Sequence, residues 1–403
     1  MAVGTGVGKQ VIYKVQPALG TKATASAAQI LRRVTSGIEL KKNTFQSNEI
    51  RTDYQISDFR HGTKYVEGPL AGELSPGTYK DFFAAALRRD FAAVTALTGL
   101  SITISGSAAP YTITRGSGSF LTDGIKVGDV VKFTAGSFAA PNTGKNLFVA
   151  SVAALTLTVY PLNNSSMTAE GPIATATLTV VGKKTYVPTT GHTNKYFTIE
   201  HWHSDISESE SFVDCKVNTV AVAITPTGMA TVDFGFIGRS QDLAASQYFS
   251  SPTAATTTGV TAGANGLLMV SGATVGNVTG ISFDINGNMT REDVIGSTSS
   301  PDIFAGSVLV SGQLTILFED DTYSQMFEDE TEASIAVALT TSNDAAADFV
   351  SFVMPRIKVG GNSKDDGQKG IVQTLPFTAL FDGTGGAGTD SEQSTIVIQD
   401  SQA

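Results

Sequence analysis

The sequence predicts a mainly β protein, an antiparallel β-sandwich with one or two flanking helices and an inserted small all-β domain. Short segments with alternating apolar and polar residues recur along most of the chain, which is the pattern of half-buried strands. Helical periodicity is confined to about two short segments. Charged residues make up 16% of the 403 residues and glycines number 41, which is typical of a β-rich structural protein more than of a helical enzyme.

The first segment, residues 1–35, is predicted to be an extended N-terminal segment with one strand. Tyr13, Val15 and Leu19 carry the apolar pattern, and a run of small residues follows them. Further along, Ile38 and Leu40 alternate with polar neighbours and predict a second strand.

A long polar segment, residues 44–62, separates this strand from the next one, at Tyr65-Val66. It holds seven ionisable side chains among few apolar ones. Structureless loops of this length in compact domains are usually functional or disordered. We therefore expect a contact outside the subunit to order this loop.

The strongest helix signal follows Ser75-Pro76. Serine is a favoured N-cap, and proline is tolerated at the first helical position because its missing N–H would have no partner there. Tyr79, Phe83, Leu87 and Phe91 then recur every four residues and form one apolar face. The spacing predicts a helix over residues 78–92 that covers one sheet.

An abrupt change of composition at Thr98-Gly99 predicts an inserted domain over residues 100–185. Its short alternating runs are separated by Gly, Pro and Asn, the pattern of a small antiparallel sandwich or barrel. The main domain is then discontinuous, with residues 1–99 and 186–403. An insert whose ends lie close together is easily tolerated.

From residue 186 onward the pattern predicts further strands, interrupted by a long surface excursion over residues 239–280. The acidic turn Glu319-Asp320-Asp321 predicts the start of a short helix that carries Tyr323, Met326 and Phe327. A last strand is predicted near the carboxyl terminus, in residues 394–399.

Charge is distributed unevenly and argues against a protein that grips nucleic acid. Lys and Arg outnumber Asp and Glu by 13 to 8 over residues 1–98, whereas residues 186–403 hold 8 Lys and Arg against 26 Asp and Glu. A nucleic-acid binder needs a dense basic face. No stretch is apolar enough to predict a membrane span, and residues 1–10 lack the pattern of a secretory signal, so we expect folding in a bacterial cytoplasm. The single cysteine, Cys215, is interpreted as a small buried side chain.

No catalytic or metal-binding motif in the sequence is complete. His201, His203 and Asp205 could share one strand face as a metal site, and the alternative is a polar strand face with Trp202 buried opposite, which we favour. The acidic run at 319–332 is interpreted as a solvated helix cap, with metal binding as the second interpretation. We expect no catalytic residues, no metal and no cofactor, and hence no enzyme.

The order over residues 36–91 of strand, S-N-E-I-R-x-D loop, strand, E-L-S-P and F-F-A-A-A-L helix resembles the tail tube (major tail) proteins of long-tailed bacteriophages. The resemblance continues through residues 196–240, 281–340 and 349–381. It implies the tail-tube sandwich fold and subunits that close into a ring, usually hexameric, whose sheets form a continuous barrel wall with paired edges. Stacked rings would form a conduit that guides DNA from the capsid into the host cell.

The resemblance also implies which residues meet a partner. The loop at 44–62 would contact the adjacent ring, with candidates Phe45, Asn48, Glu49, Arg51, Asp53, Tyr54, Asp58 and Arg60. Other tail proteins (tape measure, tail tip, terminator) would be partners, the location would be the virion tail, and no membrane would be involved. The insert departs from the basic tube, and we expect it on the tube exterior.

The channel wall is expected to be acidic, since a basic wall would bind the phosphates of passing DNA. Asp233 and Asp284 alternate with apolar neighbours on predicted strands and are the candidates for this wall. The alternative function is a secreted β-rich adhesin or carbohydrate-binding protein, a class that usually carries a signal peptide and aromatic-rich loops.

Overall fold

Residues 3–368 and 370–403 are described by a computed structural model. Strands make up 47% of the chain and helices 5%, and strand pairs such as β14–β15 and β23–β24 are antiparallel. The prediction of a mainly β, antiparallel fold is confirmed.

The body is a sandwich of two sheets. The first, which we name the arm sheet, consists in spatial order of β4 (Glu39–Gln46), β5 (Phe59–Glu73), β15 (Thr231–Gly238), β14 (Glu208–Ile224), β19 (Val278–Asn286), β22 (Leu309–Leu317) and β26 (Val372–Ala379). The second, which we name the docking sheet, consists of β12 (Lys183–Tyr186), β27 (Val397–Asp400), β24 (Phe349–Val359), β23 (Ala333–Thr340), β17 (Gly266–Val270) and β18 (Ala273–Thr274). Pairing of β24 with β26 joins the two sheets at one side.

A smaller sheet extends from the first half of β14. It contains β2 (Gln29–Ile30), β1 (Lys9–Val15), β13 (Phe197–His203) and β16 (Ser240–Ala244). Short strands complete the body: β3 (Thr35–Ser36) pairs with β5, β25 (Ser363–Asp365) pairs with β26, and β20 (Thr290–Arg291) pairs with β21 (Ile303–Phe304).

The segment 239–280 differs from the predicted surface excursion. β16, β17 and β18 all lie within it. The run from Leu267 to Val270 pairs with β23, and Met269 and Val270 are buried. Its four consecutive apolar residues therefore form an integral strand of the docking sheet, so this part of the prediction was wrong.

Helix α1 (Lys80–Ala86) lies against the core, but it is shorter than the predicted 78–92. Gly77 has a φ of +75°, which separates the Ser75-Pro76 turn from the helix. At the other end Arg88 has a φ of +58° and closes the helix. The predicted N-cap also differs, since Ser75 Oγ hydrogen-bonds Thr78 Oγ1 at 2.6 Å instead of a helical N–H.

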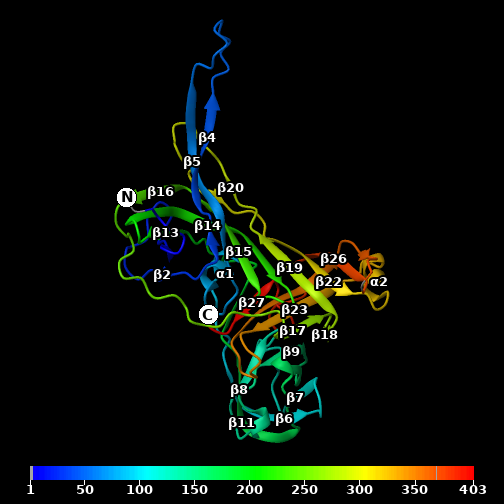
Figure 1. Cartoon of the computed structure of the whole chain (residues 1–403). Coiled ribbons are helices and arrows are strands. Elements are labelled where there is room, and N and C mark those ends of the chain that lie inside the picture. Colours follow the sequence, from blue (N-terminus) through cyan, green and yellow to red (C-terminus); the bar gives the residue numbers. More distant parts are fainter. Residues whose placement is uncertain (1–2, 369) are drawn as a thin grey trace.

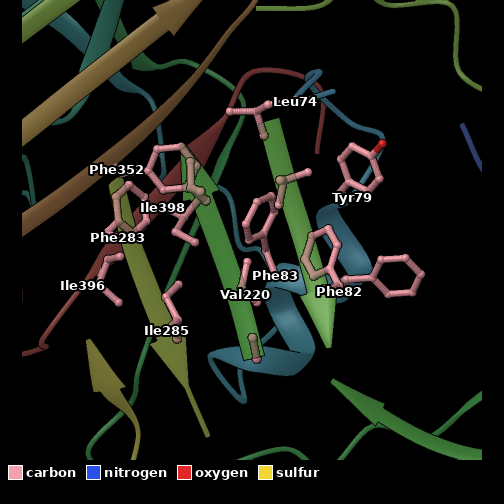
Figure 2. Close-up of a cluster of buried hydrophobic side chains, with 14 of the residues drawn as sticks. Leu74, Tyr79, Phe82, Phe83, Val220, Phe283, Ile285, Phe352, Ile396 and Ile398 are labelled. Atoms are coloured by element: carbon pink, nitrogen blue, oxygen red, sulfur yellow. The ribbon is translucent and has the colours of Figure 1, made fainter. Parts of the chain in front are cut away.

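Aromatic side chains of α1 meet both sheets in the core (Figure 2). The ring of Phe83 lies 5.4 Å from that of Phe234 on β15 and 5.8 Å from that of Phe352 on β24. Phe352 in turn lies 5.0 Å from Phe283 on β19. Aromatic pairs at these distances stabilise a core beyond the area they bury. The predicted apolar helix face thus fills the space between the sheets.

Helix α2 (Thr322–Glu328) follows the acidic turn as predicted, and the backbone N–H of Thr322 donates to Asp320 Oδ1 at 2.9 Å. In the described part of the chain, no helix is long and apolar enough to cross a membrane.

The inserted segment forms a closed six-stranded barrel. Its strands are β6 (Leu97–Ser105), β7 (Tyr111–Arg115), β8 (Val130–Ala135), β9 (Leu147–Val152), β10 (Thr156–Pro161) and β11 (Glu170–Val180), with 3-10 helices at Ala140–Asn142 and Leu162–Asn164. Two limits differ from the expected 100–185, because the first strand begins at Leu97 and residues 183–186 pair with β27 of the body.

The barrel packs on the outer face of the docking sheet, away from the arm (Figure 1). Phe148 and Leu162 of the barrel belong to one buried apolar cluster with Met269 (β17), Val353 (β24) and Val397 (β27). The Gln399 side chain accepts from the backbone N–H of Val130 and donates to its carbonyl. Barrel and body therefore share a buried interface.

Candidate functional site

The first candidate site is a hairpin arm formed by β4 and β5. Gln46 pairs with Phe59 and Phe45 pairs with Arg60, so the strands continue into the predicted 44–62 loop and leave 47–58 as the tip. The predicted loop limits were too wide because cross-strand pairing extends the hairpin. The other end of β5 is anchored along β15, and the arm projects from the body in Figure 1.

Apolar side chains on the arm are uncovered. Relative exposures are 103% for Ile50, 99% for Tyr54, 66% for Ile56, 60% for Phe45 and 56% for Phe59. A cluster of large exposed apolar side chains marks a surface that another molecule covers.

Two ion pairs form at the tip and directly beside it. Arg51 forms a 2.7 Å ion pair with Asp53, and Arg60 forms one with Asp58 at the same distance. These guanidinium groups lower the pKa of Asp53 and of Asp58. Ser57 Oγ donates to Glu49 Oε2 at 2.9 Å. Both arginines are thus paired with carboxylates, and the uncovered apolar groups of the tip are what a partner would bury.

All eight predicted loop candidates are on this hairpin and exposed: Phe45, Asn48, Glu49, Arg51, Asp53, Tyr54, Asp58 and Arg60. The sequence reasoning missed Ile50, Ile56 and Phe59. They could have been recognised in the sequence, because each is an apolar residue inside a polar segment.

The base of the arm is braced by residues 291–298. Thr63 Oγ1 donates to Asp293 Oδ2 at 2.7 Å, and the Asn43 amide donates to the same oxygen at 3.2 Å. The Arg291 guanidinium lies 3.5 Å from the centre of the Tyr65 ring. These contacts hold the lower part of the arm and leave the tip free.

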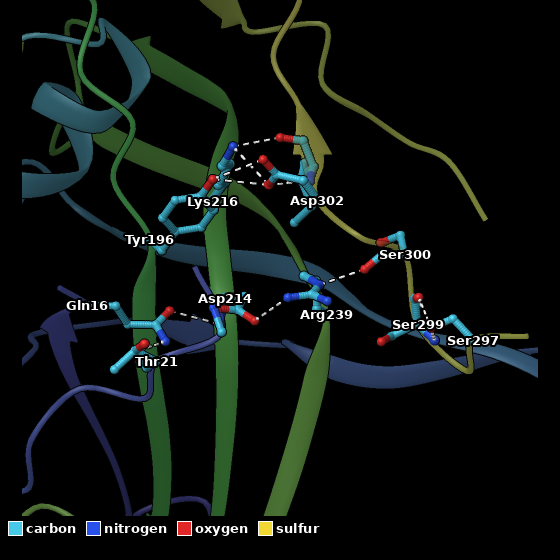
Figure 3. Close-up of polar contacts among 12 residues, drawn as sticks. Gln16, Thr21, Tyr196, Asp214, Lys216, Arg239, Ser297, Ser299, Ser300 and Asp302 are labelled. Carbon is cyan, nitrogen blue, oxygen red and sulfur yellow. Dashed lines mark hydrogen bonds and ion pairs between the residues drawn. The ribbon is translucent and has the colours of Figure 1, made fainter. Parts of the chain in front are cut away.

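A buried polar network anchors residues 300–303, which follow this bracing segment, to the body (Figure 3). On β14, Lys216 Nζ donates to the Ile303 carbonyl at 2.6 Å and lies 3.6 Å from Asp302 Oδ1. Arg239 donates to the Ser300 carbonyl at 2.7 Å and to Asp214 at 3.1 Å. Satisfied buried networks of this kind specify one arrangement.

A second surface is the outward face of the arm sheet, which we name the acidic face. It carries Glu67 and Glu73 on β5, Asp233 on β15 and Asp284 on β19, all exposed. Thr231 pairs with Glu73 and Asp233 pairs with Ala71, so these residues share one side of the sheet. Lys41 on β4 is on the same side and forms a 3.4 Å ion pair with Glu67, and Lys216 on β14 is also on this side but buried.

The acidic face and the barrel lie on opposite sides of the sandwich. On β15 the neighbours of Asp233, Val232 and Phe234, point into the core between the sheets. On β24, Phe352 points into the same core, and the next residue, Val353, points away from it toward the barrel.

The predicted histidine site is organised differently. His201 is buried, its Nε2 is 2.8 Å from Ser36 Oγ, and its Nδ1 is 3.7 Å from Glu210. Burial lowers the pKa of His201 to about 4. Asp205 instead accepts hydrogen bonds from Thr5. In the residues that the structure describes, no three His, Cys, Asp or Glu side chains are placed to hold a metal ion.

Comparison with protein families provides independent information. A family model described as phage tail tube protein matches residues 3–379, a range that includes the arm, the barrel and both sheets as far as β26. A comparison with curated proteins finds no match.

Proposed function

Because the chain belongs to the phage tail tube protein family and is thereby a structural component of the virion tail, we propose that its copies close into hexameric rings that stack into a tube for DNA delivery. Edge strands of neighbouring arm sheets would pair within the ring, since unpaired edges otherwise invite aggregation. The single observation that carries the stacking step is the arm with its uncovered apolar side chains.

In this proposal the arm is the contact between adjacent rings. Its tip residues cannot bury their apolar groups on their own subunit, because the arm projects away from the body. A second copy is the partner that a self-assembling tube supplies at this position. The eight loop candidates, with Ile50, Ile56 and Phe59, would form this contact.

The acidic face would line the channel. Ring symmetry would repeat its four carboxylates around the lumen, where salt with a screening length of about 8 Å masks them only in part. Such a wall repels phosphates, so DNA would pass without specific binding. The barrel would then be on the tube exterior, since it covers the opposite outer face of the sandwich. We keep the division into a discontinuous body and an inserted domain as part of this proposal, with the strands of the inserted barrel spanning residues 97–180.

The remaining partners follow from the same role. Tape measure, tail tip and terminator proteins would meet the ends of the tube, and assembly would take place in the host cytoplasm. A structural role of this kind requires no catalysis. Family membership decides against the alternative of a secreted adhesin or carbohydrate-binding protein.

Electron microscopy of the purified protein tests the proposal. We expect negatively stained rings or tubes from the wild type. The double variant Ile50→Ser/Tyr54→Ser should lose tubes and keep the melting temperature of the free subunit, since both side chains are fully exposed. Phe381→Ser, at an exposed position outside the arm, is the matched control and should still form tubes. Normal tubes from the arm variant would contradict the stacking role of the arm.

A further inference from the structure

Three charged side chains meet in a buried cluster at the junction of barrel and body. Lys184 is on β12, Asp129 immediately precedes β8 of the barrel, and Glu392 is in the segment before β27. Lys184 Nζ lies 3.1 and 3.3 Å from the two carboxylate oxygens of Asp129 and 2.8 Å from Glu392 Oε1. The side chains of Lys184, Asp129 and Glu392 are 6%, 4% and 12% exposed.

The surroundings hold these groups in place. Asp129 Oδ2 accepts from the backbone N–H of Lys126 at 2.9 Å. The Lys126 side chain does not compete for the carboxylates, because its ammonium donates to the carbonyls of Gly386 and Thr389. Among the described residues, the ion pairs of Lys184 are with Asp129 and Glu392 alone.

A buried triad of one cation and two carboxylates carries a large desolvation cost. Burial raises the pKa of Asp129, and the attraction of Lys184 opposes this rise. Burial by itself lowers the pKa of Lys184, and the two carboxylates outweigh burial so that its pKa is raised. One proton can pass from Lys184 to Asp129 along their hydrogen bond, which leaves the total number of bound protons unchanged. The two buried charges then become a neutral amine and a neutral carboxylic acid.

We propose that Lys184 and Asp129 form an intramolecular amide bond with Glu392 as the catalytic base. The lone pair of the neutral Lys184 Nζ attacks Asp129 Cγ, and a C–N bond forms. Glu392 accepts a proton from this nitrogen and delivers it to the departing hydroxyl of Asp129, which leaves as water when the C–O bond breaks. The products are an amide N–H, one water molecule and an ionised Glu392, so atoms and protons balance and no oxidant is required.

The arrangement meets the requirements of this reaction. The nucleophile Lys184 contacts both the electrophile Asp129 and the base Glu392 before reaction, and pre-positioning of this kind replaces a large part of an activation barrier. Lys184 and Glu392 also line a cavity of about 590 Å³ between barrel and body, which gives the released water a path out. The product removes two charges from the buried junction and retains Glu392 as the remaining carboxylate.

The bond would add a covalent cross-link between barrel and body to the two chain connections that already join them. Asp129 belongs to the barrel and Lys184 to the strand that pairs with β27, so the link closes a loop over residues 129–184. A cross-link of this kind stabilises the folded state chiefly by restricting the unfolded chain. It would keep the barrel docked on the body when mechanical load or heat loosens the noncovalent interface.

Intact-mass spectrometry of the purified, denatured full chain tests the proposal. We expect a mass one water molecule below that of the sequence, and a protease digest in which one branched peptide contains both Asp129 and Lys184. Glu392→Gln and Lys184→Arg should have the full sequence mass. Asp390→Asn, a neighbouring carboxylate in the same segment, is the matched control and should still lose water.

The wild-type measurement does not depend on whether any variant folds. A wild-type mass equal to that of the sequence, or separate linear peptides containing Asp129 and Lys184, would overturn the proposal and leave an ordinary buried ion pair. Water loss of equal extent in Glu392→Gln would refute the assignment of Glu392 as the base.

Discussion

Asp233 and Asp284 lie on either side of Ala221, in one row across β15, β14 and β19 of the arm sheet. Two carboxylates on strands far apart in sequence thus share one exposed face. Reversing both charges tests whether this face lines the channel. Assembled tubes of Asp233→Lys/Asp284→Lys should retain short duplex DNA at low salt and release it as salt rises, whereas wild-type tubes should not bind it.

The control for this experiment is Glu319→Lys/Asp321→Lys, which makes the same change of net charge at the turn before α2. Co-sedimentation of DNA with tubes is the measurement. Equal retention by both double variants would mean that net charge, and not the acidic face, determines DNA binding.

The aromatic contacts of α1 predict a large loss of stability on truncation. Phe83 is 2% exposed and touches rings from both sheets. Phe83→Ala should lower the free energy of unfolding by ~3 to 5 kcal/mol, as measured by urea denaturation. Phe381→Ala, at a position 48% exposed, should change it little. A Phe83→Ala variant that unfolds at the parental urea concentration would show that the core assignment of α1 is wrong.

The arm tip should exchange its amide hydrogens at different rates before and after assembly. Residues 48–58 are exposed and belong to no strand, so we expect rapid exchange in the free subunit and protection in the tube. Hydrogen exchange followed by mass spectrometry measures both states. The peptide covering Val66–Glu73, which is paired with β15, is the internal reference and should be protected in both. Unchanged exchange of the tip would exclude it from the stacking contact.

Removal of the barrel should uncover an apolar surface on the docking sheet. Replacing residues 97–180 with a short Gly/Ser linker exposes Met269, Val353 and Val397, and we expect this variant to aggregate. Adding Thr at these three positions should restore solubility and give tubes of smaller diameter in electron micrographs. If the soluble variant forms no tubes, the barrel takes part in the ring itself.

Two buried groups predict opposite dependences of stability on pH. Burial raises the pKa of Asp400 to about 6 from 3.8, so the native state holds this proton more tightly than the unfolded state. The free energy of unfolding then falls as pH rises from about 4 to about 6, by about 3 kcal/mol. Burial lowers the pKa of His201 to about 4 from 6.5, so its contribution rises over nearly the same range.

Single variants separate these two contributions. Relative to wild type, Asp400→Asn should gain stability as pH rises from 4 to 6, and His201→Gln should lose it. Chemical denaturation at several pH values measures both curves. Parallel curves for wild type and Asp400→Asn would mean that Asp400 does not titrate in this window.

Residues 281–286 and 335–339 illustrate what the sequence by itself determined. In residues 281–286 apolar and polar side chains alternate, and in residues 335–339 large apolar side chains alternate with alanines. Both patterns follow from the two-residue repeat of a strand, so the two strands could be predicted locally. The same local logic identified the apolar face of α1 and the arm as an unusual polar segment. It predicted a helix that is too long, because the positive φ values at Gly77 and Arg88, which limit α1, depend on how the flanking chain packs in the folded protein.

Tertiary structure alone decided which of these pieces meet. The row containing Asp233 and Asp284 depends on the register of two strands against β14, and register is set by pairing and core packing across the whole sheet. The contact of Asp129, Lys184 and Glu392 depends on docking of the barrel against the body. Local periodicity carries no information about contacts between residues far apart in the sequence. Such contacts arise when two elements bury apolar surface against each other, and the conformation of each element alone does not determine them.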